Sequence, residues 1–134
     1  MKKSVLGIKI DDVSLNQAVG IVEKWLKGAG KHYIVTPNPE IVVMAQDDQE
    51  LKKIIDNADL AIPDGAGLRL TTDIVCHTPG IDLMEGLIKL ASEKGFTTGF
   101  LGGRGKVAEE CAERLKKKYP KLKVSFAQSG GEVD

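Results

Sequence analysis

Short apolar runs alternate along the chain with longer stretches in which apolar residues recur at helical spacing. The short runs predict strands. The first is a short strand or edge ribbon that contains Val5, Ile8 and Ile10 and breaks at the pair Asp11-Asp12. Further strands are expected over residues 32–35, 59–62, 97–101 and about 122–126.

Residues with capping side chains mark the starts of the predicted helices. Ser14 and Gln17 fit a capping box for a first helix that stops before Gly28. Pro39 suits the first turn of the next helix, because a proline lacks the N–H that this turn leaves unpaired. The later helices are expected over residues 40–46, from Asp48 through Ile55, from Asp82 through Ala91, and over 107–118, whereas residues 67–75 carry helical and strand signals of similar strength.

Strands that alternate with helices imply right-handed crossovers and a mainly parallel sheet. The chain has 134 residues, enough for one domain with its own core. We therefore expect a single α/β domain over residues 1–134, with a Rossmann-like, mainly parallel sheet flanked by helices in three layers.

The amino-acid composition argues against several classes of protein. The 19 basic and 19 acidic residues give no formal net charge, so the broad electrostatic attraction of a nucleic-acid binder is missing. Cys76 and Cys111 lack the paired spacing of a zinc site and are too few for a disulfide scaffold. We expect no signal peptide at Met1–Ile10 and no membrane span, because no stretch approaches about 20 apolar residues. An intracellular location is the expectation.

Three loops follow predicted strands and should lie at the ligand-binding edge of an open α/β sheet: Thr36–Glu40, Pro63–Gly67 and Gly102–Lys106. In the first loop, Asn38 either caps the following helix or takes part in ligand binding. Asp64 stands between a proline and a glycine after an apolar strand, and it is either a general base or an Asx turn or helix cap. Both pairs of alternatives remain open at the level of the residues.

The glycines of the third loop permit close approach of a phosphate to the backbone and to the next helix. An NAD-binding site would need an acidic residue about 20 positions later, where this chain has Ser125–Gln128, so an oxidoreductase is disfavoured. No nucleoside-triphosphatase motif is present. Other single residues are expected to have structural roles. Trp25 and Cys111 are expected in the core, and His32 and His77 at structural or exposed positions. The run Lys116–Lys118 is interpreted as a helix end in preference to a membrane or phosphate patch.

Four motifs resemble those of the WecG/TagA/CpsF glycosyltransferase family. They are the runs Thr36–Gln46, Ala61–Leu68, Gly80–Met84 and Phe100–Gly103, in this order along the chain. The resemblance implies transfer of N-acetylmannosamine, or a related sugar, from a UDP donor to a sugar on a polyprenyl diphosphate, with inversion and without an obligatory metal or other cofactor. It implies a cytoplasmic enzyme peripheral to the inner face of the cell membrane, in teichoic acid or surface polysaccharide synthesis.

The same resemblance assigns roles to residues. Asp64 becomes the catalytic base, Thr36 positions the sugar or the leaving diphosphate, and no residue is expected to bind a metal. Further residues of the three loops and of the Gly80–Met84 motif are expected to bind the substrate: Asn38, Gly65, Gly67, Asp82, Gly102, Gly103 and Arg104. We expect Thr36 and Asp64 to face one cleft beside the turn that starts at Gly102.

Two departures from the family pattern lead to an alternative function. Cys76–Pro79 replaces a longer family segment that carries an arginine, and family chains continue beyond the position of Asp134 into a basic, membrane-directed appendage. The alternative is a catalytically incomplete donor-binding or assembly module with the same fold, which would associate into homo-oligomers through an unfinished sheet edge.

Overall fold

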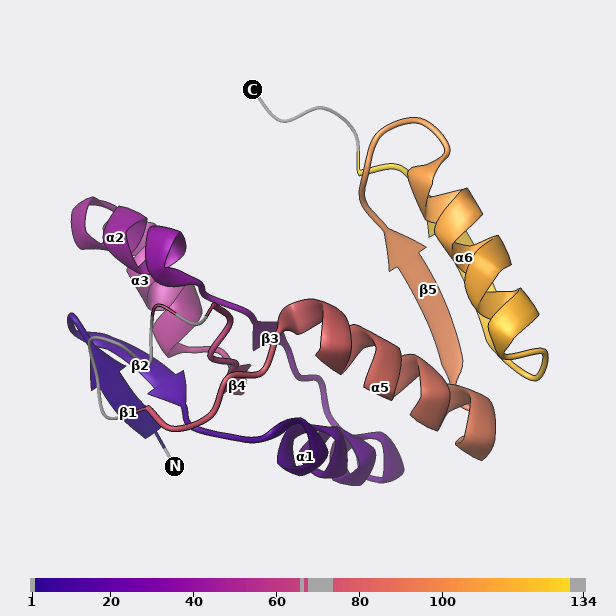
Figure 1. The fold of residues 1–134 in the computed structure, drawn as a ribbon, viewed down its shortest axis with the longest axis horizontal. Coiled ribbons are helices and arrows are strands. Elements are labelled where there is room, and N and C mark those ends of the chain that lie inside the picture. Colours follow the sequence, from indigo (N-terminus) through magenta and orange to yellow (C-terminus); the bar gives the residue numbers. More distant parts are fainter. Residues whose placement is uncertain (1, 66, 68–73, 131–134) are drawn as a thin grey trace. The chain divides into compact units, whose positions relative to one another are not determined.

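The computed structural model describes residues 2–65, 67 and 74–130, which form a mixed α/β structure (Figure 1). The chain is divided into two compact units, Met1–Met84 and Glu85–Asp134, and each is described by itself. The expected mixture of helices and parallel strand pairs is confirmed. The described strands form three two-stranded sheets, of which two are parallel and one is antiparallel.

The first unit begins with a β-hairpin, where the sequence predicted a short strand or edge ribbon. Strand β1 (Lys2–Val5) pairs antiparallel with β2 (Ile8–Asp11). Leu6 and Gly7 join them with φ values of 49° and 81°. Two consecutive residues at positive φ match the twist of hairpin strands, so this tight turn reverses the chain directly.

Strands β3 (Ile34–Val35) and β4 (Leu60–Ala61) form a parallel pair. Helices α2 (Pro39–Asp47) and α3 (Gln49–Asp56) connect them. Asp48 caps α3 as predicted, and Asn38 caps α2, which was one of the two roles left open for it. Strand β3 is shorter than the expected range 32–35. The N–H of Tyr33 donates to the carboxylate of Asp59 at 2.9 Å, which replaces a backbone ladder bond there.

The core of the first unit packs the inner face of the hairpin against α2, α3 and β4. Ile8 and Ile10 are fully buried on this face. The cluster contains Val5, Ile8, Ile10, Val42, Ala45, Ile55, Ala61 and Ile74. These side chains come from segments far apart in the sequence, so hydrophobic burial joins the hairpin to the parallel pair.

Helix α1 (Leu15–Lys27) starts with the predicted capping box of Ser14 and Gln17. The expected core position of Trp25 is wrong, because this side chain is only half-buried. Its ring stacks on His32, with centroids 4.4 Å apart and planes 7° from parallel. His32 also lies 3.2 Å from a carboxylate oxygen of Asp59, a pairing that the sequence did not indicate.

The second unit contains most of α5 (Gly80–Lys94), followed by β5 (Thr97–Leu101), α6 (Val107–Lys118) and β6 (Lys123–Gln128). Strands β5 and β6 are parallel, with a register shift at Gly99, where a Cβ would meet the ring of Phe126. The second core comprises Ile88, Ala91 and Leu122, with Phe96, Phe100, Leu115, Tyr119 and Val124 packed against it.

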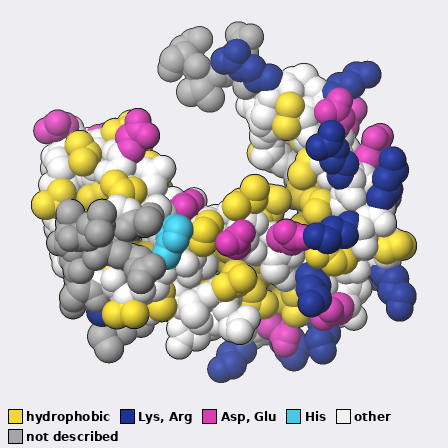
Figure 2. Space-filling model, viewed as in Figure 1, with side chains coloured by type: hydrophobic (Ala, Val, Ile, Leu, Met, Phe, Trp, Pro, Cys, Tyr) yellow, Lys and Arg dark blue, Asp and Glu magenta, His cyan; other side chains and the backbone are white. Residues whose placement is uncertain are grey.

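Two expectations for α6 have different outcomes. Cys111 was expected in the core but is only half-buried, and Val107 in the first turn is 57% exposed. Lys116–Lys118 occupy the last turn, as predicted, where cations offset the negative end of the helix dipole. Lys118 pairs with Glu85, and lysine and arginine side chains lie mainly over this unit in Figure 2.

Asp12 connects the segment at Val75 and Cys76, before α5, to the hairpin through hydrogen bonds. Its carboxylate accepts hydrogen bonds from the backbone N–H groups of Cys76 at 2.8 Å and Val75 at 3.1 Å, and it pairs with Lys3 at 2.8 Å. Burial by itself raises the pKa of Asp12. The bonds from Lys3, Cys76 and Val75 outweigh this effect and hold the pKa well below its ordinary value.

We predict that the free energy of unfolding depends on Asp12 in acid. Because the folded-state pKa is depressed, the stabilisation is complete above the unfolded-state pKa and is lost as pH falls below about 4. Asp12→Asn should lower the free energy of unfolding at pH 7 by about 1.5–3 kcal/mol and flatten its acid dependence. Urea unfolding at several pH values measures both effects. The exposed Asp47→Asn variant is the control, and an Asp12→Asn profile parallel to the wild-type profile would contradict the prediction.

We also predict that His32 shields Trp25, the single tryptophan of the chain. His32→Ala should shift the tryptophan emission to longer wavelength and lower the free energy of unfolding by about 0.5–1.5 kcal/mol, since the stacked contact is lost. Fluorescence spectra and thermal unfolding test this. His77→Ala, at an exposed histidine, is the matched control, and equal spectra for both variants would refute the shielding.

Candidate functional site

Two of the three predicted loops meet at the carboxyl ends of β3 and β4. The N–H of Ile62 donates to the carbonyl of Val35 at 2.9 Å, and the N–H of Asp64 donates to the carbonyl of Pro37 at 3.3 Å. These bonds continue the parallel pairing beyond the strands. The Thr36 and Asp64 loops therefore leave the same edge of the β3–β4 pair, as the sequence predicted for this pair of loops.

Gly80, the first residue of α5, contacts both predicted catalytic residues. Its N–H donates to Oδ2 of Asp64 at 3.2 Å. A Cβ at position 80 would lie 3.0 Å from Cγ2 of Thr36 and 3.3 Å from Oδ2 of Asp64. Thr36 and Asp64 are both half-buried, and the Thr36 methyl group and the Asp64 carboxylate both lie beside the first residue of α5.

Asp64 therefore caps a helix, which was the structural alternative to a catalytic role, although the helix is distant in sequence. The two roles are compatible, because the described contact occupies one lone-pair direction of one carboxylate oxygen. The catalytic role itself stays a prediction. Helix α5 begins two residues before the expected start at Asp82, because the carbonyl of Pro79 accepts bonds from the N–H groups of Asp82 and Leu83.

The substrate-binding candidates of the first two loops are packed against each other. Oδ1 of Asn38 accepts the N–H of Ile41 at 2.9 Å, so this side chain is a helix cap in the structure. Gly65 has a φ of 101°, and a Cβ there would lie 2.9 Å from Cδ of Pro39. At Gly67 a Cβ would lie 3.1 Å from Cγ of Pro39. Both glycines thus permit the close approach of the two loops.

Asp82 lies in the exposed first turn of α5, where a carboxylate is favoured by the helix dipole. Its position two residues after Gly80 places it on the same helix start as the Asp64 contact. The role of Asp82 in substrate binding remains a prediction.

The glycine loop belongs to the second unit and lies between β5 and α6. Gly102, Gly103 and Gly105 have φ values of 136°, 69° and 57°, a backbone shape that favours glycine at each position. A Cβ at Gly103 would lie 2.9 Å from the side chain of Val107. The N–H of Gly102 donates to the carbonyl of Gln128 at 3.0 Å, which fixes the loop to the end of β6.

Arg104 is exposed within this loop, and its carbonyl accepts the N–H of Val107 at 3.2 Å. The loop therefore has the predicted form of a glycine turn that leads into a helix. The two units are described separately, so a common cleft of Thr36 and Asp64 with Gly102–Arg104 stays a prediction.

Sequence reasoning missed the residues that hold the two loops in place. Gly80 was identified only as the first residue of a family motif, with no role of its own, and Thr78 was assigned no role. Thr78 is 1% exposed; its hydroxyl donates to the carbonyl of Val13 at 2.8 Å, and its N–H donates to the carbonyl of Pro63 at 2.9 Å. A glycine directly after a proline at a helix start was the available signal for Gly80. For Thr78 the sequence offered none.

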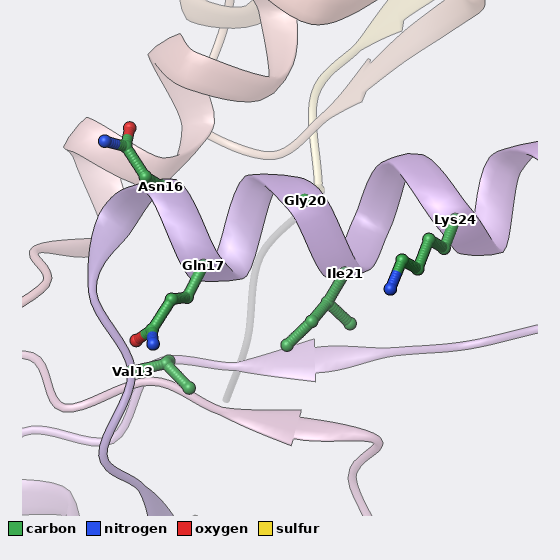
Figure 3. A pocket seen from close by; sticks show the side chains of 6 residues that line it. All are labelled: Val13, Asn16, Gln17, Gly20, Ile21 and Lys24. Carbon is green, nitrogen blue, oxygen red and sulfur yellow. The ribbon is translucent and has the colours of Figure 1, made fainter.

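A separate groove of about 380 Å³ runs along α1 (Figure 3). Gln17 and Ile21 project from the helix on the side of Val13. The groove is lined by Val13, Asn16, Gln17, Gly20, Ile21 and Lys24. None of these is a predicted site residue.

Two kinds of feature are absent from the part of the chain that the structure describes. Among them, no group of three or more His, Cys, Asp or Glu side chains is arranged to hold a metal ion. Within the same ranges, no helix combines the length and the apolar character needed to cross a membrane.

Comparison with known proteins places this geometry in a family. Proteins from Staphylococcus aureus strains NCTC 8325 / PS 47, COL and MSSA476, each named N-acetylglucosaminyldiphosphoundecaprenol N-acetyl-beta-D-mannosaminyltransferase, are 30% identical to this chain over 140 residues. The matches cover 99% of this chain and 54% of each relative, so the chain spans about half the length of these relatives. A model of the glycosyl transferase WecG/TagA/CpsF family matches residues 3–132, and the chain therefore belongs to this family.

Proposed function

We propose that this chain functions in the transfer of N-acetylmannosamine, or a related sugar, from a UDP donor to a sugar carried on undecaprenyl diphosphate. The printed name of the relatives describes such a transfer, and the family is shared by this chain. The observation that carries the proposal is the contact of Gly80 with both Thr36 and Asp64, because it joins three of the four family motifs in one unit.

Asp64 is the proposed general base. The acceptor hydroxyl attacks the anomeric carbon of the donor sugar, its proton passes to the carboxylate of Asp64, and a new carbon–oxygen bond forms. The bond between the anomeric carbon and the diphosphate oxygen breaks, and its electron pair leaves with UDP. Attack from the face opposite the leaving group inverts the anomeric carbon. A positioned base contributes typically about 100- to 10,000-fold to such a step.

Negative charge that develops on the leaving diphosphate requires hydrogen-bond donors. We assign this role to the hydroxyl of Thr36 and to the glycine loop at Gly102–Arg104, which leads into the amino terminus of α6. Asn38, Gly65, Gly67 and Asp82 are proposed to line the substrate pocket. In this proposal the transfer requires neither an obligatory metal nor a bound cofactor.

A Rossmann-like, three-layer fold is part of the same proposal. Each parallel pair, β3–β4 and β5–β6, has helices in its connection, which is the repeating unit of a Rossmann-like, three-layer fold. We propose this fold for the family domain, a location at the cytoplasmic face of the membrane where the lipid-linked acceptor is presented, and a role in teichoic acid or surface polysaccharide synthesis.

Titration calorimetry with UDP and UDP-N-acetylmannosamine tests donor recognition, and a turnover assay with a polyprenyl-diphosphate-linked N-acetylglucosamine tests transfer. The proposal expects binding of both nucleotides and release of UDP. Binding without turnover would favour the alternative of a donor-binding or assembly module, which sedimentation would detect as a homo-oligomer. A folded chain that binds neither nucleotide at millimolar concentration would refute the proposal.

We predict that Asp64→Asn lowers turnover about 100- to 10,000-fold while donor affinity changes little, because the amide keeps the shape but does not accept the proton. Turnover and titration calorimetry measure the two effects separately. Asp47→Asn, at an exposed carboxylate at the end of α2, is the control. Turnover retained by Asp64→Asn would assign the base to another residue.

Thr36→Ala should have a smaller effect. If the Thr36 hydroxyl donates to the leaving group in the transition state, its removal costs about 1–3 kcal/mol, equal to a loss of about 5- to 150-fold in kcat/KM. Thr36→Ser retains the hydroxyl and should restore most of the activity. Equal activity of the Ala and Ser variants would show that the hydroxyl has no such role.

A further inference from the structure

Gly80 joins three elements that are far apart in the sequence. Its N–H bonds the Asp64 carboxylate, and the position of its absent Cβ lies against the Thr36 methyl group and the same carboxylate oxygen. No side chain at position 80 stands between Thr36 and Asp64. The first residue of α5 thereby contacts both residues that the proposed reaction uses.

We propose that Gly80 is a positioning residue: its N–H sets the orientation of the Asp64 carboxylate, and its missing side chain sets the spacing between Asp64 and Thr36. This inference rests on the proposed function, because it assigns Gly80 an effect on transfer through Asp64. It adds a residue to which the motifs gave no such role.

The direction of a carboxylate matters for proton transfer, because the accepting oxygen must lie within hydrogen-bond reach of the attacking hydroxyl. A carboxylate on a surface loop rotates freely about its last side-chain bond. The N–H of Gly80 limits this rotation by donating to Oδ2 at 3.2 Å. This bond does not use Oδ1. Gly80 therefore selects one orientation of Asp64 without supplying a side chain.

The segment around Gly80 is fixed, so it cannot move aside for a larger residue. Thr78 is buried and bonded at both its hydroxyl and its N–H, and Leu83 is 3% exposed on the inner face of α5. On the opposite side, Thr36 adjoins the fully buried Pro37. An added methyl group 3.0 Å from Thr36 Cγ2 would consequently displace Thr36 or Asp64, the two parts with remaining freedom.

Gly80→Ala tests the inference because it keeps the N–H and adds only the methyl group. We expect turnover to fall by up to about 100-fold through displaced reacting groups, with donor affinity near the wild-type value and the structure still folded. Gly20→Ala in α1 is the matched control, since a Cβ at Gly20 meets no atom within 4 Å. Gly80→Ala turnover equal to that of Gly20→Ala would overturn the proposal.

A second measurement does not depend on turnover or on the folding of a Gly80 variant. The amide proton of Gly80 in the wild-type chain should resonate downfield and exchange slowly, because a carboxylate accepts it. Asp64→Ala should shift this resonance upfield and speed its exchange, and Asp64→Asn, which retains a neutral acceptor, should fall between. An amide signal unaffected by either Asp64 variant would overturn the orienting role.

The two measurements separate this inference from the proposed function. If the wild-type chain binds no UDP nucleotide, but the amide resonance of Gly80 changes on Asp64 substitution, the transferase proposal is refuted. The orienting contact is then still supported. If the wild-type chain is active and the Gly80→Ala variant has normal turnover, the transferase proposal is supported and the role of Gly80 is refuted.

Discussion

Two adjacent carboxylates at the end of β2 hold the first unit together. Asp11 accepts the N–H of Ala61 in β4 at 2.8 Å and pairs with Lys2, whereas Asp12 accepts the N–H groups of Val75 and Cys76. Asp11 is the last residue of β2 and Asp12 follows it, and the two side chains bond different segments. The hairpin is thereby bonded both to the strand that precedes Asp64 and to the segment that precedes Gly80. The meeting of Asp64 with Gly80 depends on these two attachments.

Burial of these carboxylates would destabilise the fold without their donors, because an unpaired buried charge is strongly unfavourable. Each carboxylate has a lysine of β1 beside it and backbone N–H groups in front of it. The arrangement is therefore specific: an alternative packing of β4 or of residues 74–79 would leave a buried charge without its donors. Charge pairing here contributes to the choice of one structure as well as to its stability.

Local features of the fold were predictable, and contacts between distant segments were not. The capping box at Ser14, the caps at Asn38 and Asp48, and the range of α6 follow from residues within a few positions of each other. The half-buried Trp25 and its stack on His32 depend on where the chain returns after Gly30. Likewise, the sequence placed the Thr36 and Asp64 loops at one sheet edge, but the contact of Gly80 with both residues depends on the three-dimensional path of the chain into α5.

The bonding of the aspartates distinguishes structural carboxylates from a candidate base. Asp12 accepts two backbone N–H groups and a lysine, which hold it in its charged form, and Asp11 is 7% exposed with its donors in place. From the described residues, the Asp64 carboxylate accepts one backbone N–H, on one oxygen, and the residue is half-buried. A general base needs a fixed direction together with a lone pair that a substrate can reach. Of these three aspartates, Asp64 meets both requirements, since its single helix contact orients the carboxylate without saturating it.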